Sequence, residues 1–201
     1  MNVLGFAKNA IKIEADAITS LVDQLDQSFV KAVDLIRKCK GKVVVSGVGK
    51  SGIIGRKIAA SLASTGTPAF FVHACEAGHG DSGMIENGDV VILISNSGET
   101  KEVLSVLPIL KKIGCSKIAI TGKAESTLAQ LTDIALVYTY SRESDLLNLA
   151  PTTSAVMTLV LGDALAVTLS MLGGFEDSDF HRYHPGGSLG EQLSALKDEG
   201  R

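Results

Sequence analysis

The stretch from Asp89 to Ile113, DVVILISNSGETKEVLSVLPILKKI, contains the main signals for the fold of this chain. Its first part, Asp89–Ser95, is a continuous apolar run, which is typical of a strand buried on both faces of a parallel sheet. Asn96–Glu99 is predicted to be a turn. Thr100–Ile113 has apolar residues three and four positions apart, which predicts a helix. The stretch therefore indicates a buried strand, a tight turn and a covering helix.

The same alternation of strand and helix recurs on both sides of this stretch. Further strands are predicted at Lys42–Ser46, Ala69–His73, Lys117–Thr121 and Ile134–Tyr138, and a long apolar helix at Ala150–Leu172. Helical spacing over about 6–39 predicts an N-terminal helix. Apolar strands separated by helices indicate a parallel sheet covered on both faces. The sequence predicts one domain over 1–201, whose sandwich, about 41–195, is a three-layer α/β/α arrangement with five parallel strands in flavodoxin-like order.

The composition suits a globular α/β protein, because 45% of the 201 residues are hydrophobic and 20% are charged. The net charge of −3 and the lack of long basic runs argue against binding to nucleic acid or to an anionic membrane. Uninterrupted apolar runs such as Val90–Ile94 are shorter than the about 20 residues that span a bilayer. The three cysteines match neither a disulfide framework nor a zinc site. We expect a cytoplasmic protein.

The turn after the central strand has the features of a phosphate-binding site. Amides at the start of a helix are unpaired and carry the positive end of the helix dipole. Hydroxyl groups can close around the remaining oxygens of a phosphate, and ligands of open α/β sheets bind at the carboxyl ends of the strands. One hydroxyl would be explained by helix capping, but three in six residues favour an anion. The predicted phosphate ligands are Ser95, Asn96, Ser97, Gly98 and Thr100.

A second glycine-rich turn, Gly47–Gly52 (GVGKSG), fits the G-x-G-x-x-G fingerprint of dinucleotide-binding folds. Such folds need an acidic residue at the end of the next strand to hold the ribose hydroxyls, and here that strand ends in His73. A dinucleotide-dependent oxidoreductase is thus a disfavoured alternative, and we expect no cofactor. The turn is predicted to present Gly49, Lys50 and Ser51 to the same small phosphorylated ligand.

Several motifs together resemble the sugar isomerase (SIS) domain, and within it the branch that acts on D-arabinose 5-phosphate. The resemblance runs from about residue 8 to residue 193 and rests on the motifs GVGKSG, GHGDSG, SNSGET, LAPTTS and HPGGSLG. It implies an aldose–ketose isomerase that interconverts D-ribulose 5-phosphate and D-arabinose 5-phosphate through an enediol, supplying Kdo for lipopolysaccharide or capsule. An isomerase of another phosphosugar and a non-catalytic phosphosugar sensor remain alternatives.

The resemblance also implies the catalytic residues, which are Lys50, Glu102, Glu143 and His184. Either Glu102 or Glu143 is expected to take the carbon-bound proton, while His184 serves the oxygens. Lys50 would balance the phosphate or the enediolate. His79 and Thr153 are expected to line the substrate pocket.

The expected partners also follow from the resemblance. We expect a homo-oligomer, most simply a tetramer, in which His184 or His79 reaches a neighbour's site, with CMP-Kdo as a candidate feedback inhibitor. No metal is expected to be required, although zinc bound at His79 and His184 could inhibit. Many family members continue past HPGGSLG into a pair of CBS domains, whereas this sequence stops at Arg201, as a short form or a trimmed one. Regulation through CBS domains is therefore not expected here.

Overall fold

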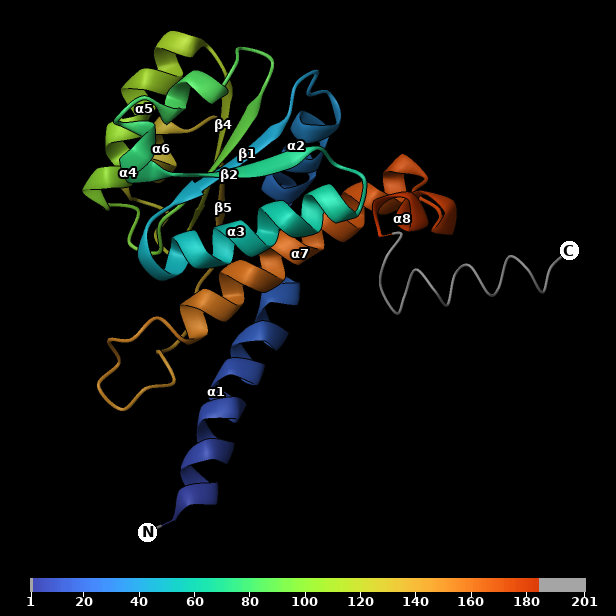
Figure 1. Ribbon diagram of the computed structural model, residues 1–201. Helices are drawn as coiled ribbons and strands as arrows, with labels where there is room; N and C mark the ends of the chain where they lie inside the picture. The colour runs from blue at the N-terminus through green and yellow to red at the C-terminus, as the bar shows by residue number, and fades with distance from the viewer. Residues whose placement is uncertain (1, 185–201) are drawn as a thin grey trace, which may run out of the picture.

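The computed structural model describes residues 2–184 and has a single five-stranded parallel sheet at its centre (Figure 1). The strand order is β2-β1-β3-β4-β5, which confirms the predicted flavodoxin-like order. The rest of the predicted sandwich, about 185–195, and the motif that follows His184 lie outside the described residues. The strands are β1 (Val43–Gly47), β2 (Ala69–His73), β3 (Val90–Ile94), β4 (Ser116–Thr121) and β5 (Ile134–Val137).

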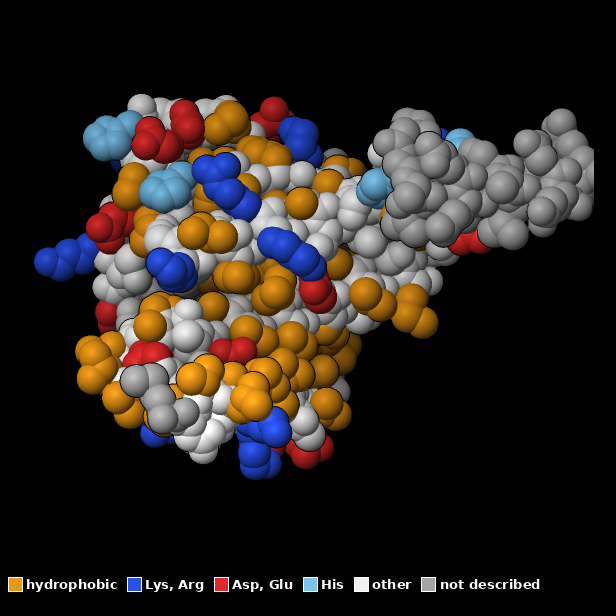
Figure 2. All heavy atoms as spheres, turned by 60° about the horizontal axis from the view of Figure 1, so that its bottom comes forward, with side chains coloured by type: hydrophobic (Ala, Val, Ile, Leu, Met, Phe, Trp, Pro, Cys, Tyr) orange, Lys and Arg blue, Asp and Glu red, His pale blue; other side chains and the backbone are white. Residues whose placement is uncertain are grey.

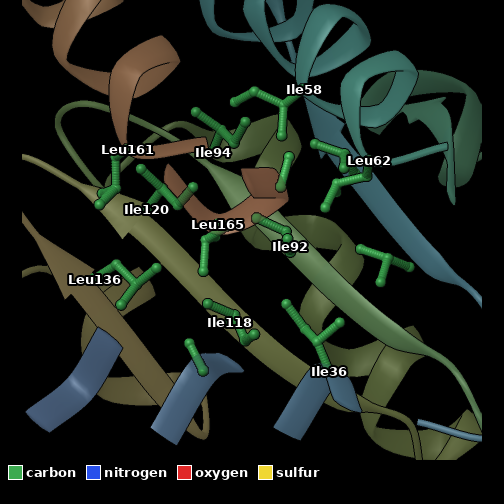
Figure 3. Packing of buried hydrophobic residues seen from close by; sticks show 14 of the residues in the cluster. Ile36, Ile58, Leu62, Ile92, Ile94, Ile118, Ile120, Leu136, Leu161 and Leu165 are labelled. Carbon is green, nitrogen blue, oxygen red and sulfur yellow. The ribbon is translucent and has the colours of Figure 1, made fainter. Parts of the chain in front are cut away.

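Helices cover both faces of the sheet, because successive strand side chains point to opposite sides. Val43 and Val45 pack in one hydrophobic cluster and Val44 in the other. Figure 3 shows the first cluster, in which side chains from the covering helices meet Ile92 and Ile94 of the central strand. The helices on that face are α2 (Gln27–Arg37), α3 (Gly49–Ser64) and α7 (Thr153–Gly173), and those on the other are α4 (Ala74–Ala77), α5 (Lys101–Ile113) and α6 (Thr127–Leu131).

The prediction of one N-terminal helix over about 6–39 is wrong, because the chain forms α1 (Val3–Gln24) and then α2. The break is made by Asp26, whose carboxylate accepts a hydrogen bond of 2.8 Å from the Ser28 amide and so caps the second helix. Only Ala17 and Leu21 of α1 are buried, and the helix projects away from the sandwich in Figure 1. Four further short elements were not predicted: α4, the 3-10 turn Asp81–Met84, α6 and α8 (Asp177–Tyr183).

Helices α3 and α7 lie side by side and run in the same direction. At their starts, Ser51 lines the same small hollow as Ser154, and at their ends Thr65 lines a hollow with Gly173. Midway, Lys57 of α3 donates a hydrogen bond of 2.7 Å to Asp163 of α7. Both helices therefore start at the carboxyl edge of the sheet and end beside α8.

Helix α7 is long and apolar enough to cross a membrane, judged by length and composition alone. In the structure, Leu161 and Leu165 of α7 pack against the sheet beside Ile58 and Leu62 of α3 (Figure 3). A helix that packs in this way against a sheet and a second helix has the features of a core helix.

The close approach of α3 and α7 depends on Gly162. A Cβ atom at this position would lie 2.4 Å from Cγ1 of Ile58, which is fully buried. We expect Gly162→Val to destabilise the protein by about 1–3 kcal/mol through overpacking, and to lower the melting temperature measured by circular dichroism. Gly173→Ala is the matched control, because a Cβ there meets nothing within 4 Å. Equal melting temperatures for Gly162→Val and the wild type would contradict this account of the packing.

Candidate functional site

The predicted site residues gather at the carboxyl edge of the sheet, because parallel strands all end on one side. Gly49–Ser51 follow β1, and Ser95–Thr100 follow β3, the strand that lies next to β1 in the sheet. The chain turns in opposite directions from these two strands, and ligands of open α/β sheets bind at such a switch point. The segment that contains Glu143 follows β5 and leads into α7.

The turn Ser95–Thr100 is held together by its own hydroxyl groups. The Ser95 hydroxyl accepts a hydrogen bond of 3.1 Å from the Gly98 amide and lies 2.7 Å from the Thr100 hydroxyl. Ser95 is 2% exposed, so its side chain shapes the turn from inside. Ser97 is exposed, and its hydroxyl accepts from the Glu99 amide. Of the three predicted hydroxyl ligands, Ser97 is thus the one that faces solvent.

Helix α6, which was not predicted, supports this turn from outside. Gly98 has a φ of 67°, in the left-handed region, and a Cβ there would lie 2.1 Å from the Ser126 hydroxyl. The carbonyl of Gly98 accepts from the Leu128 amide, and the Glu99 carboxylate accepts from the Thr127 amide at 2.6 Å. The motif ESTLAQL, with Ser126 as the helix cap, was the available signal for this support.

The starts of α3 and α5 are open to a ligand. Neither helix has a side-chain cap among residues 2–184, and the Thr100 hydroxyl, at the capping position of α5, bonds to Ser95 instead. The first amides of both helices are therefore available to an anion. Lys50 is exposed at the start of α3, and Glu102 is exposed in the first turn of α5.

A cavity of about 560 Å³ lies beside the turn, on the side of β4 and β5. Its size lies within the usual range for small-molecule sites. Three of the predicted residues line it, namely Asn96, Ser97 and Glu143. The other lining residues with polar side chains were missed by sequence reasoning: Lys123, Thr139, Tyr140, Ser141, Arg142 and Asn148.

Glu143 is 5% exposed and accepts hydrogen bonds from four donors. The Thr152 amide, the Thr152 hydroxyl and the Ser154 amide donate to Oε2 at 2.9, 3.1 and 3.1 Å, and the Tyr140 hydroxyl donates to Oε1 at 3.0 Å. Burial by itself raises the pKa of Glu143, but hydrogen bonds from Ser154, Thr152 and Tyr140 outweigh it and lower the pKa of the carboxyl. Glu143 therefore caps α7 as a carboxylate.

Two tyrosines connect Glu143 to the phosphate turn. The Tyr140 hydroxyl accepts a hydrogen bond of 2.9 Å from the Asn96 side-chain amide, and the Tyr138 hydroxyl donates to the Asn96 side-chain oxygen at 3.0 Å. Burial raises the pKa of Tyr138 well above its ordinary value. Burial also raises the pKa of Tyr140, and the Glu143 carboxylate adds to that rise. Both phenols therefore keep their protons at neutral pH.

The other ten predicted site residues, Lys50 and Glu102 among them, do not line the cavity. Thr153 is 1% exposed, and its hydroxyl is buried with no hydrogen-bond partner among the described residues. The hydroxyl is therefore closed off from a ligand in the cavity. His184 directly follows α8 as its C-cap, with its ring stacked on Phe180 at 4.1 Å between centroids and Nδ1 3.0 Å from the Phe180 carbonyl.

The histidines lie at separate places in the chain. His184 lies beyond the ends of α3 and α7, whereas Lys50 and Glu143 lie at their starts. A helix of 21 residues such as α7 is about 31 Å long. His79 is exposed between α4 and the 3-10 turn, and Figure 1 shows α4 and α8 on opposite sides of the molecule. One chain therefore does not bring His79 and His184 together, and residues 2–184 contain no cluster of three His, Cys, Asp or Glu side chains that could hold a metal.

Comparisons with known proteins show which family the chain resembles in sequence. The model of the SIS domain family matches residues 35–168. The chain is 51% identical over 187 residues to arabinose 5-phosphate isomerase KdsD of Pseudomonas aeruginosa, and 50% identical over 186 residues to KdsD of Escherichia coli. The alignments cover 93% and 92% of this chain, but the chain spans only 57% of the length of either relative.

A solved structure gives the same picture of the fold. A protein of Escherichia coli CFT073, in complex with arabinose 5-phosphate, superposes with a TM-score of 0.89, at 47% sequence identity. The match covers 92% of this chain and 98% of that one. The likeness therefore extends over nearly all of the described residues.

The geometry of the turn can be tested at Gly98. A side chain at a φ of 67° costs about 1–2 kcal/mol, and the Cβ of alanine would also collide with Ser126. We expect Gly98→Ala to weaken binding of inorganic phosphate, measured by calorimetry, by about tenfold or more. Gly88→Ala is the control, because its Cβ would lie at an ordinary 3.6 Å from its nearest neighbour. Unchanged phosphate affinity in Gly98→Ala would remove the turn from the binding site.

Proposed function

We propose that this chain, which belongs to the SIS domain family, is an aldose–ketose isomerase that interconverts D-ribulose 5-phosphate and D-arabinose 5-phosphate. The observation that carries the proposal is the turn Ser95–Thr100, which lies between two uncapped helix starts and beside a cavity of about 560 Å³. The about 50% identity to KdsD proteins and the arabinose 5-phosphate bound in the similar Escherichia coli structure support a pentose phosphate as the substrate. The chain would act in the cytoplasm, supplying Kdo for lipopolysaccharide or capsule.

The reaction moves one proton between neighbouring carbons of the sugar through an enediol. A base removes the proton from C2 of the aldose and returns it to C1, while a hydroxyl proton moves between the two oxygens. We assign the base to Glu102, because its carboxylate is exposed beside the open start of α5. Glu143 is less suited, because its carboxylate already accepts from four donors. Lys50 would stabilise the enediolate oxygen.

The group that serves the substrate oxygens would come from a second copy of the chain. His184 lies at the opposite ends of α3 and α7 from Lys50, so it cannot complete the site of its own chain. Figure 2 shows apolar side chains gathered on the face that forms the bottom of Figure 1. Exposed apolar residues that a neighbouring copy could cover include Val3, Leu4, Phe6, Ile11, Leu146, Leu147 and Leu149. We propose a homotetramer whose sites are shared between copies.

Other parts of the expected function remain proposals. An isomerase of a hexulose or heptose phosphate would use the same turn and differ in the depth of its cavity. A non-catalytic phosphosugar sensor would keep the turn without needing Glu102. We propose that no metal is required, that zinc at His79 or His184 would inhibit, and that CMP-Kdo, a later product, could occupy the cavity as a feedback inhibitor.

The carbon base is tested by Glu102→Gln. The change removes the proton acceptor and leaves the phosphate turn intact, so kcat for D-arabinose 5-phosphate should fall by about 10²–10⁴-fold with little change in KM. Glu125→Gln, also an exposed glutamate, should retain full activity. The assay is run with pentose, hexose and heptose phosphates side by side, with and without a chelator. Full turnover by Glu102→Gln would reject Glu102 as the base. If the wild type turns over none of these phosphosugars, the proposal that the chain is an isomerase is rejected.

The shared site is tested by mixing two inactive variants. If each site takes Glu102 from one copy and His184 from another, co-expressed Glu102→Gln and His184→Asn chains should recover up to about a quarter of wild-type activity. Co-expressed Glu102→Gln and Lys50→Ala chains serve as the control and should recover little, because both residues belong to the same edge of one chain. Equal recovery in both mixtures, or an active monomer in sedimentation, would contradict a shared site.

A further inference from the structure

We infer that Tyr140 and Glu143 are positioning residues, which hold the Asn96 side chain of the phosphate turn in one orientation. The inference deepens the proposed function and rests on it, because it gives these residues a role in the binding of the same phosphosugar. It is carried by the chain of hydrogen bonds that runs from the start of α7, through Glu143 and Tyr140, to Asn96. Under this inference Glu143 is not the base that transfers the proton, but a residue that supports the structure of the site.

The direction of every hydrogen bond in this series follows from the carboxylate of Glu143, at which the series starts. An ionised carboxylate can only accept, so the Tyr140 hydroxyl has to donate its single proton to Glu143. The oxygen of Tyr140 is then free to accept, and the only donor that the Asn96 side chain can offer is its NH₂ group. The side-chain oxygen of Asn96 therefore points the other way and accepts from Tyr138. One charged group thus determines the orientation of an amide two residues along the chain of bonds.

The main chain of Asn96 is held as well. Its carbonyl accepts a hydrogen bond of 3.0 Å from the Gly122 amide and one of 3.3 Å from the Thr121 hydroxyl, both at the end of β4. Asn96 lies between Ser95, which shapes the turn, and Ser97, which faces solvent. Side-chain bonds from one direction and main-chain bonds from the other leave this residue little freedom. Ser97, the proposed phosphate ligand, therefore follows a residue that is held in place, which limits the positions its hydroxyl can adopt.

The segment that carries Glu143 is itself organised to hold the carboxylate in place. The amide of Glu143 donates to the Asn148 side-chain oxygen at 2.6 Å, and its carbonyl accepts from the Arg142 guanidinium at 3.0 Å. Asn148 has a φ of 56°, the left-handed conformation that asparagine tolerates better than most residues. A negative charge at the start of α7 is also favoured by the dipole of that helix. A carboxylate used in this way has three donors on Oε2 and one on Oε1, so moving it to take a substrate proton would break the cap of α7.

The test measures phosphate binding and turnover separately, in three variants. Tyr140→Phe removes the hydroxyl and leaves the α7 cap in place, Glu143→Gln removes the charge, and the third variant combines both changes. We expect each single variant to weaken the Kd of inorganic phosphate, measured by calorimetry, by about tenfold, the change that corresponds to about 1.4 kcal/mol. The double variant should be no weaker than Glu143→Gln alone, because the two residues act through one chain of bonds. Glu125→Gln should bind phosphate as the wild type does.

Two further readouts separate positioning from proton transfer. The acidic limb of the pH dependence of kcat/KM should persist in Glu143→Gln, because the base is a different residue. The folded pKa of Glu143 is lowered, so its contribution to stability is present above the unfolded pKa and is lost as the pH falls through the folded one. The difference in melting temperature between wild type and Glu143→Gln should therefore hold from pH 7 to 5 and narrow below about pH 4.3.

Specific outcomes would overturn the inference. Loss of the acidic limb in Glu143→Gln with unchanged phosphate affinity would make Glu143 the base. If wild type and Tyr140→Phe bind phosphate with equal affinity, the hydrogen bonds through Tyr140 have no role in binding and the inference is rejected, even if Glu143→Gln fails to fold. If the wild type binds phosphate but turns over no phosphosugar, the proposed isomerase activity is rejected. The positioning role of Tyr140 and Glu143 is then judged from the binding data alone. Wild-type protein that does not bind phosphate would reject both.

Discussion

The parallel sheet places the carboxyl ends of all five strands on one edge, and the starts of the helices that follow are concentrated there. Each helix start brings unpaired amides and partial positive charge, which an anion or water has to satisfy. Within residues 2–184 the chain satisfies α7 itself, with the Glu143 carboxylate, and leaves α3 and α5 without a side-chain cap. The proposed phosphate would therefore bind at the two open starts, because the start of α7 is already capped.

The same parallel arrangement underlies the proposal of a site shared between copies. Helices α3 and α7 run together from the edge that holds Lys50 and Glu143 to the other end of the molecule, so α8, which follows α7, lies away from these two residues. The ring of His184, stacked on Phe180, lies at that far end. If an isomerase of this fold needs a second group for the substrate oxygens, a neighbouring copy is the direct source. The exposed apolar residues of α1 and of the segment before α7 offer the surface for such a neighbour.

The fold could be predicted from the sequence because its strands are apolar runs with hardly any competing pattern, as in Val90–Ile94. The break at Asp26 was missed because apolar spacing continues through it, and only the capping side chain interrupts the helix. At the candidate site, the existence of a hydroxyl-rich turn after β3 was predictable, because its signal is local. The roles within it were not, since nothing in the order of residues tells whether a serine hydroxyl, such as that of Ser95, points to a ligand or to Thr100.

Asn96 illustrates how a residue predicted to bind the phosphate can have a different role in the structure. Both polar atoms of its side chain are engaged by Tyr138 and Tyr140, which follow a strand that lies two positions away in the sheet. An amide held at both ends in this way has at most its second N–H left for a phosphate, and it makes the turn rigid. Rigidity favours binding, because the hydroxyl of Ser97 and the amides of α5 then need not be ordered by the ligand. In the proposed site, the charge of Glu143 would act on the phosphate without touching it, because only an acceptor can impose this orientation of the hydrogen bonds.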